Sequence, residues 1–364
     1  MLDRKLIDDF REEVNDNYFF ACFYYQNRNG KNLWSIICSA MDWIDVSVDY
    51  LNDHQFSNLG RTQSIELFSL IECCDIITEA IEQLHRVLFS TKKRVFGEDN
   101  DCFEGNIFSQ KDREYFKTIR ACFGAHPVNL DDSLWGDEKK YASWSGRFES
   151  GYDFDVVLYS NKPDRDNIYF HIRFNQIEKF VNKYYNHLPV LKKQLSCQYR
   201  RFCEYMRKQP FDCAGTYQEQ LLILQEESKK RLDIDYYSYI ISEVRLIYET
   251  PITCANNVEL VEQYRNALVA VINEVKENLQ NMTFTDLSAN NILEPTISGL
   301  PKGWTYSMSK LYDAARGLDY PDVMWIDDIE QVCKGSFVFD YYDAKELYVL
   351  VKSALYHLQS NMKM

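Results

Sequence analysis

Hydrophobic residues recur every three or four positions through the first 130 residues, and this spacing predicts amphipathic helices. In the first segment, Leu2, Ile7, Phe10 and Val14 form one apolar stripe. Short polar segments separate the periodic stretches, and Ser109 is the expected N-cap of the last one. Such a series predicts an up-and-down helical bundle. The expected helices are 2–27, 32–53, 61–90 and 109–125.

The apolar period changes in the middle of the chain. Residues 153–160 and 167–174 are rich in β-branched and aromatic residues, and the turn-forming stretch NKPDRD separates them, so we expect a β-hairpin. Residues 140–149 are a candidate for a further strand. A long helix is expected over 175–209, with a bend at Pro189.

The last third of the chain is again periodic, apart from a loop-rich stretch at 284–307. The whole pattern predicts a mainly α protein with a small β-hairpin insertion. We expect an N-terminal bundle at 1–130, a hairpin with the long helix at 131–215, and an acidic helical domain at 216–364. The expected helices of the last domain are 217–231, 235–249, 257–281, 322–333 and 343–360.

Charge is unevenly distributed along the chain. The net charge is −14 over 364 residues, which argues against a protein that binds nucleic acid with its whole surface. Residues 131–210, with 14 basic and 11 acidic side chains, are the exception at +3. We therefore expect a polyanion to contact the chain in this middle part.

Cysteines and apolar runs bear on the location of the protein. The 11 cysteines are scattered without a C-x-x-C pair, and the charged start MLDRKLIDDF does not resemble a signal peptide. Reduced thiols in the cytoplasm are the expected state. No run of about 18 apolar residues is present, so we expect no membrane span.

The stretch IRACFGAHPVNL (119–130) carries the candidate chemistry. Arg120 offers a permanent cation for phosphate, and His126 offers an acid and base near neutral pH. On an unbroken helix, residues six apart differ by about 240° in azimuth, so the two would not share a face. A break at Gly124, before Pro127, is therefore required if both are to contact one ligand. The spacing also occurs at Arg165 and His171.

An Arg/His pair late in a helical bundle resembles the HEPN superfamily, over about residues 1–130. The resemblance implies a metal-independent endoribonuclease, of the kind found in toxin and antiviral-defence systems, in which Arg120 holds phosphate and His126 is the acid and base. It also implies a homodimer formed through the bundle, with both Arg/His sets in one cleft. No metal or other cofactor is expected.

Two other interpretations remain open. Gly124 and Pro127 can simply end a helix, with His126 as a cap for backbone carbonyls. The bundle is then a non-catalytic module that binds a protein, or a sensor of phosphate or nucleotide. On this interpretation the acidic C-terminal domain also binds a protein partner.

Charged side chains of two helices form further candidate surfaces. Glu72, Asp75, Glu79 and Glu82 recur on one helix face, which we interpret as solvated, with lining of a cleft or orientation of Arg120 as the alternatives. Basic residues interleaved with Tyr199, Phe202 and Tyr205 are typical of contacts to single-stranded RNA, and equally of a helix with a basic outer face and an aromatic inner face. The candidate RNA-binding residues are Lys92, Lys93, Arg94, Lys192, Lys193, Arg200 and Arg201.

Overall fold

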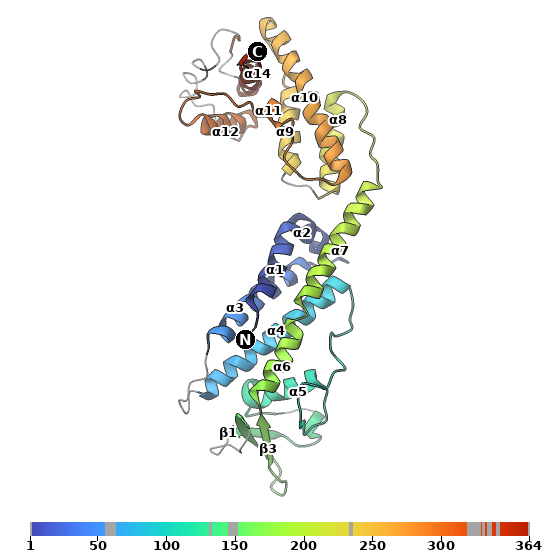
Figure 1. The fold of residues 1–364 in the computed structure, drawn as a ribbon, viewed down its shortest axis with the longest axis vertical. Coiled ribbons are helices and arrows are strands. Elements are labelled where there is room, and N and C mark those ends of the chain that lie inside the picture. The colour runs from blue at the N-terminus through green and yellow to red at the C-terminus, as the bar shows by residue number, and fades with distance from the viewer. Residues whose placement is uncertain are drawn as a thin grey trace. The chain divides into compact units, whose positions relative to one another are not determined.

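A computed structural model describes the protein at residues 2–54, 63–130, 133–144, 152–232, 236–318, 329, 332, 337–339 and 343–362 (Figure 1). Most of these residues are helical, and the sheet among them has three strands, so the predicted mainly α fold is confirmed. The chain divides into two compact units, Met1–Arg200 and Arg201–Met364. The hairpin thus belongs to the same unit as the N-terminal helices.

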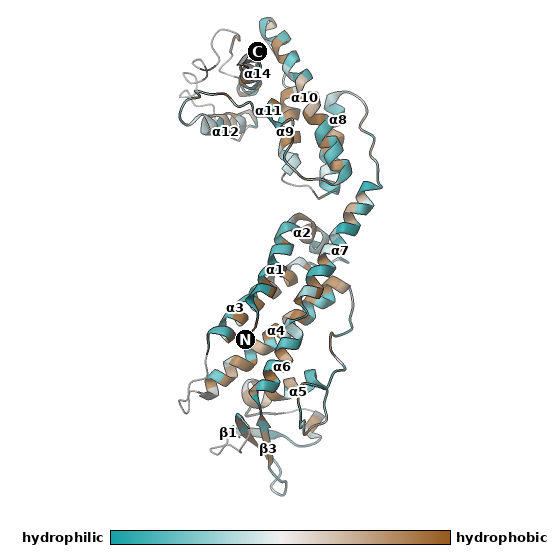
Figure 2. Ribbon diagram, in the orientation of Figure 1, coloured by the Kyte–Doolittle hydropathy of each residue, from teal (hydrophilic) through white to brown (hydrophobic). Residues whose placement is uncertain are grey.

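The first unit contains amphipathic helices whose apolar stripes are buried against one another. Hydrophobic and hydrophilic residues are mixed along the longer of these helices (Figure 2). α3 and α4 lie side by side and form the most extensive helix pair of this unit. Its helices are α1 (Arg4–Asp16), α2 (Tyr18–Gln26), α3 (Trp34–Asp53), α4 (Gln63–Phe89), α5 (Asp112–Arg120) and α6 (Phe174–Tyr185), and α7 (Leu188–Arg207) begins in it.

The predicted helix 2–27 is two helices, because the chain leaves helical geometry at Asn17. The Asn17 side-chain amide donates to the Glu13 carbonyl at 2.9 Å and so caps the end of α1. The break that separates α3 from α4, at 55–60, lies outside the described residues.

Two further boundaries differ from the prediction. Ser109 has a φ of +53° and is not an N-cap, and α5 begins only at Asp112, whose carboxylate holds the preceding loop. The predicted helix 175–209 breaks at Asn186 rather than bending at Pro189. The proline lies in the first turn of α7, where its missing N–H removes no helical hydrogen bond.

The predicted hairpin is confirmed and is extended by a third strand. β1 (Lys140–Trp144), β2 (Phe154–Ser160) and β3 (Ile168–Ile172) form an antiparallel sheet in the order β1-β2-β3. The predicted strand 140–149 is described only as far as residue 144. Phe170 of β3 is buried, and its ring lies 5.4 Å from that of Phe123, which joins the sheet to the segment after α5.

The second unit packs its helices around two groups of apolar residues. α12 was not predicted, since the sequence before it resembles a loop; it starts after Gly303, which has a φ of +94°. Of the predicted helix 322–333, only residues 329 and 332 are described. The helices are α8 (Tyr217–Lys230), α9 (Tyr236–Glu249), α10 (Ala255–Asn281), α11 (Asn290–Leu293), α12 (Trp304–Ala315) and α14 (Ala344–Met362).

Within the described part of the chain, no helix has both the length and the apolar character needed to cross a bilayer. The ten described cysteines are all free thiols.

Candidate functional site

A single π-helical turn, η2 (Ala121–Ala125), continues α5 and separates Arg120 from His126. The His126 N–H closes the turn by donating to the carbonyl five residues earlier, 3.2 Å away. A Cβ at position 124 would lie 2.6 Å from Cδ2 of Phe68 on α4, so any larger residue there requires the Phe68 ring to shift. Helical geometry ends at His126, as the following proline predicts.

Arg120 is paired with acidic side chains of α4. Its Nε and Nη2 donate to the two carboxylate oxygens of Glu72 at 3.0 and 3.1 Å, and Nε lies 3.2 Å from Oδ2 of Asp75. The hydrogen bond to Glu72 raises the pKa of the Arg120 guanidinium. The side chain is 37% exposed and lines an open groove of about 550 Å³ between α3 and α4.

His126 lines a different cavity, of about 460 Å³, along another face of α5. Lys111 and Lys117 contribute to its wall, as does Asn129. Arg120 does not line this cavity, and His126 does not line the groove at Arg120. Within one copy of the chain, the structure therefore does not bring the two predicted catalytic residues together.

Helical geometry explains why one face of α5 contacts α4 and another face lines the His126 cavity. Arg113 and Arg120 are seven residues apart and share the face toward α4. Glu114 and Thr118 are four residues apart and share the face that lines the His126 cavity. The π turn does not rotate His126 back to the arginine face.

The acidic stripe of α4 is an ion-pair surface, so its interpretation as a solvated face is wrong. Arg113, with 3% of its side chain exposed, lies 2.8 Å from Asp75, 3.1 Å from Glu79 and 3.5 Å from Glu82. Burial raises the pKa of Glu82. The alternative interpretation, that the stripe orients Arg120, agrees with the pairing to Glu72.

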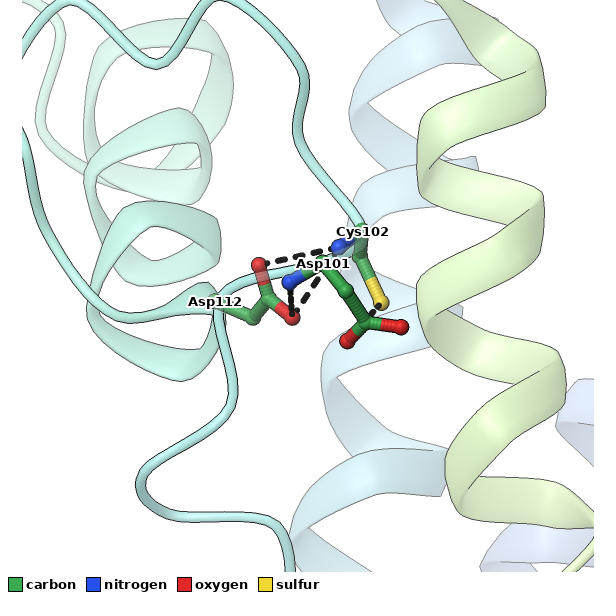
Figure 3. A group of neighbouring side chains, drawn as sticks. All are labelled: Asp101, Cys102 and Asp112. Carbon is green, nitrogen blue, oxygen red and sulfur yellow. Dashed lines mark hydrogen bonds between the residues drawn. The ribbon is translucent and has the colours of Figure 1, made fainter.

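Asp101, Cys102 and Asp112 offer atoms close enough together to hold a metal ion (Figure 3). However, the Asp112 carboxylate accepts hydrogen bonds from the backbone N–H groups of Asp101 and Cys102. Asp101 pairs with Lys183 of α6. Burial raises the pKa of the Cys102 thiol to about 12. The cluster therefore fastens the loop before α5, and we assign it a structural role.

The predicted RNA-binding residues of the loop after α4 have different environments. Lys92 and Lys93 are exposed. Arg94 pairs with Glu114 at 2.7 Å, and Glu114 lines the His126 cavity. Of these three, Arg94 is thus close to the wall of that cavity.

The predicted RNA-binding residues of α7 form a basic face. Lys193, Arg200 and Arg201 are exposed, and Lys192 is half-buried. Among the described residues, no carboxylate oxygen lies within 4.0 Å of any of these four cations. Tyr205 of the same helix is 61% exposed.

The sequence prediction missed Arg113 and the two lysines of the His126 cavity. Arg113 precedes Arg120 by two helical turns, so the acidic stripe on the neighbouring helix could have pointed to it. Lys111 and Lys117 carried no comparable signal, since their shared cavity depends on the π turn and on the loop after it.

Comparison with protein-family models, with curated proteins and with solved structures finds no match to this chain. The resemblance to the HEPN superfamily therefore rests on the bundle and the Arg120/His126 spacing alone.

Proposed function

We propose that this protein binds single-stranded RNA through the basic face of α7. The observation that carries the proposal is the absence of a carboxylate near Lys192, Lys193, Arg200 and Arg201 in the described structure, in a chain of net charge −14. Cations without a carboxylate partner are available to phosphates and release counterions when they bind them. Lys193 and Arg201 are about 12 Å apart along the helix axis, so one extended RNA strand can contact both.

Tyr205 supports RNA rather than a general polyanion as the ligand. Its exposed ring follows the basic residues on the same helix. An unpaired base can stack on an exposed aromatic ring, whereas bases inside a duplex cannot. We therefore expect single strands to bind more tightly than duplexes.

The test is fluorescence anisotropy with a labelled 20-nucleotide single-stranded RNA. The variant Lys193→Ala/Arg200→Ala/Arg201→Ala should bind at least tenfold more weakly than the wild type. The matched control Lys229→Ala/Lys230→Ala/Lys345→Ala removes three exposed cations from the second unit and should bind like the wild type. Equal loss in both variants would make the binding a matter of net charge, against the proposal.

A second candidate function is metal-independent RNA cleavage at the His126 cavity, as the HEPN resemblance implies. It is favoured by one observation: His126 shares the cavity with Lys111 and Lys117. In one protomer these lysines, rather than Arg120, would hold the phosphate, because Arg120 pairs with Glu72.

The cleavage chemistry needs one base, one acid and a cation. His126 accepts the proton of the ribose 2′-OH, and the 2′ oxygen attacks phosphorus. An ammonium of Lys111 or Lys117 neutralises the charge that grows on the phosphoryl oxygens. The P–O5′ bond breaks as the other of these two ammoniums gives the 5′ oxygen a proton, and a 2′,3′-cyclic phosphate remains.

Cleavage is tested by incubating labelled RNA with EDTA. The wild type should cleave, and His126→Ala and Lys117→Ala should each lose at least a hundredfold in rate. Equal cleavage by wild type and His126→Ala would exclude this site. An absence of cleavage with intact RNA binding would favour the non-catalytic sensor of the sequence analysis.

The location and oligomeric state belong to the same proposal. The free thiols support a reducing compartment, which we propose is the cytoplasm. The homodimer through the bundle stays a prediction of the HEPN resemblance, and a protein partner for the second unit stays a prediction of the non-catalytic interpretation.

A further inference from the structure

The groove between α3 and α4 has an apolar floor and walls that no described residue covers. Ala40 and Ala80 are small and buried, and they let the two helices approach closely. Ile36 and Trp43 of α3 form one wall, and Ile76 of α4 forms the other. Trp43 is 55% exposed, which is unusual for so large an apolar ring.

The apolar surface continues beyond the groove along α4. Ile65 is 69% exposed and lies on the same helical face as Ile76, whereas Phe68, 38% exposed, lies next to Gly124 of the π turn. Exposed apolar side chains that adjoin an open apolar groove are typical of an interaction site. Because the lining residues repeat at helical spacing on both sides, the groove has the form that accepts a third helix.

The rim of the groove is acidic. Glu72, Asp75 and Glu79 line it together with Arg120. The wider cluster has four carboxylates and two guanidiniums, because Arg113 and Glu82 complete it, and it keeps two negative charges. Glu79 is half exposed. A cationic partner therefore gains from this rim, whereas an anionic lipid surface or an RNA is repelled.

We propose that the α3/α4 groove is the docking site for a basic amphipathic helix of a protein partner. The apolar face of that helix contacts Trp43, Ile36 and Ile76, and its lysine or arginine side chains face Glu72 and Glu79. The α7 surface proposed to bind RNA is basic and on another helix, so this inference stands independently of the proposed function.

The test uses two synthetic 18-residue helical peptides with the same leucine stripe. One carries lysine at the polar positions and the other glutamate. By fluorescence anisotropy, the full-length protein should bind the lysine peptide at least tenfold more tightly than the glutamate peptide, with weaker binding as salt increases. Equal affinities, or no binding of the lysine peptide, would overturn the proposal.

A matched pair of variants locates the binding. Trp43→Lys removes the largest apolar contact and adds a positive charge in the groove. Val46→Lys adds the same charge on α3 at a 54% exposed position that does not line the groove. Trp43→Lys should lose at least tenfold in affinity and Val46→Lys less than twofold. Equal losses would place the peptide elsewhere.

Sedimentation velocity distinguishes a second copy of the chain as the occupant. We expect the same mass for the wild type and Trp43→Lys. If the wild type is a dimer that Trp43→Lys converts to a monomer, then the groove holds another copy, and the proposed partner is wrong.

Discussion

Arg120 and His126 are six residues apart in sequence but line separate cavities, one between α3 and α4 and one along another face of α5. Glu72 holds the arginine with two hydrogen bonds. His126 instead lines its cavity together with Lys111 and Lys117. Catalysis within one protomer would thus use His126 with these lysines, and Arg120 would help to join α5 to α4.

Arg113 should be the larger contributor to that junction. Arg113→Met removes a buried cation from three carboxylates, of which Asp75 keeps Arg120, and should lower the free energy of unfolding by about 3–5 kcal/mol. Arg94→Met removes an exposed pair with Glu114 and should cost about 1 kcal/mol or less. Urea unfolding measures both, and equal costs would contradict the assigned role of Arg113.

Gly124 should tolerate no side chain while Phe68 stays in place. Gly124→Ala puts a Cβ 2.6 Å from the Phe68 ring and should destabilise the protein by about 1–3 kcal/mol. In the double variant with Phe68→Ala, most of the Gly124→Ala cost should disappear, because the clashing atoms are gone. Additive effects in thermal unfolding would show that the ring is not the cause.

The His85–His187 pair should make stability depend on pH. His85 Nδ1 lies 3.1 Å from Nε2 of His187. Burial, followed by the effect of His85, lowers the pKa of His187 to about 4, and burial lowers that of His85. The unfolded chain therefore binds more protons between about pH 6.5 and 4, so stability falls as pH falls through this range.

The variant His187→Gln isolates this effect. It should flatten the loss of stability between pH 6.5 and 4, measured by urea unfolding at several pH values. The matched variant His54→Gln changes an exposed histidine and should keep the wild-type profile. The same slope in all three proteins would refute the role of the pair.

A buried ion pair should stabilise the second unit only while both members are present. Lys352 Nζ lies 2.7 Å from Glu243 Oε1, and both side chains are almost fully buried. Lys352→Met should destabilise the unit by about 3–5 kcal/mol, and adding Glu243→Leu should restore much of the loss. Lys345→Met, at an exposed position of the same helix, is the control in thermal unfolding. A double variant as unstable as Lys352→Met would argue against the pairing.

The sequence correctly predicted the elements whose conformation depends on residues close together in the chain. The apolar period of α3, the β-branched run of β2 and the proline after His126 each act locally, and each is found as expected. The end of α1 at Asn17 was missed, because the Glu13–Asn17 side-chain bond competes with a helical pattern that continues through the break.

The candidate site was harder to predict, since it depends on contacts between distant segments. Glu72 and Arg120 are 48 residues apart in the sequence. The acidic stripe of α4 pairs with Arg113 and Arg120 only because α5 packs against α4. Because of the π turn, His126 lines the same cavity as Lys111 and Lys117. A helical turn with one extra residue has no local signature in the sequence ACFGA.

The most direct test of the account is the salt dependence of RNA binding, because the slope counts the phosphates that the protein neutralises. For a single-stranded RNA, each cation contributes about 0.7 to the slope of log K against log salt. The variant Lys193→Ala/Arg200→Ala/Arg201→Ala should therefore have a slope smaller in magnitude by about 2 than the wild type. An unchanged slope would mean that α7 does not contact the RNA, and would contradict the account.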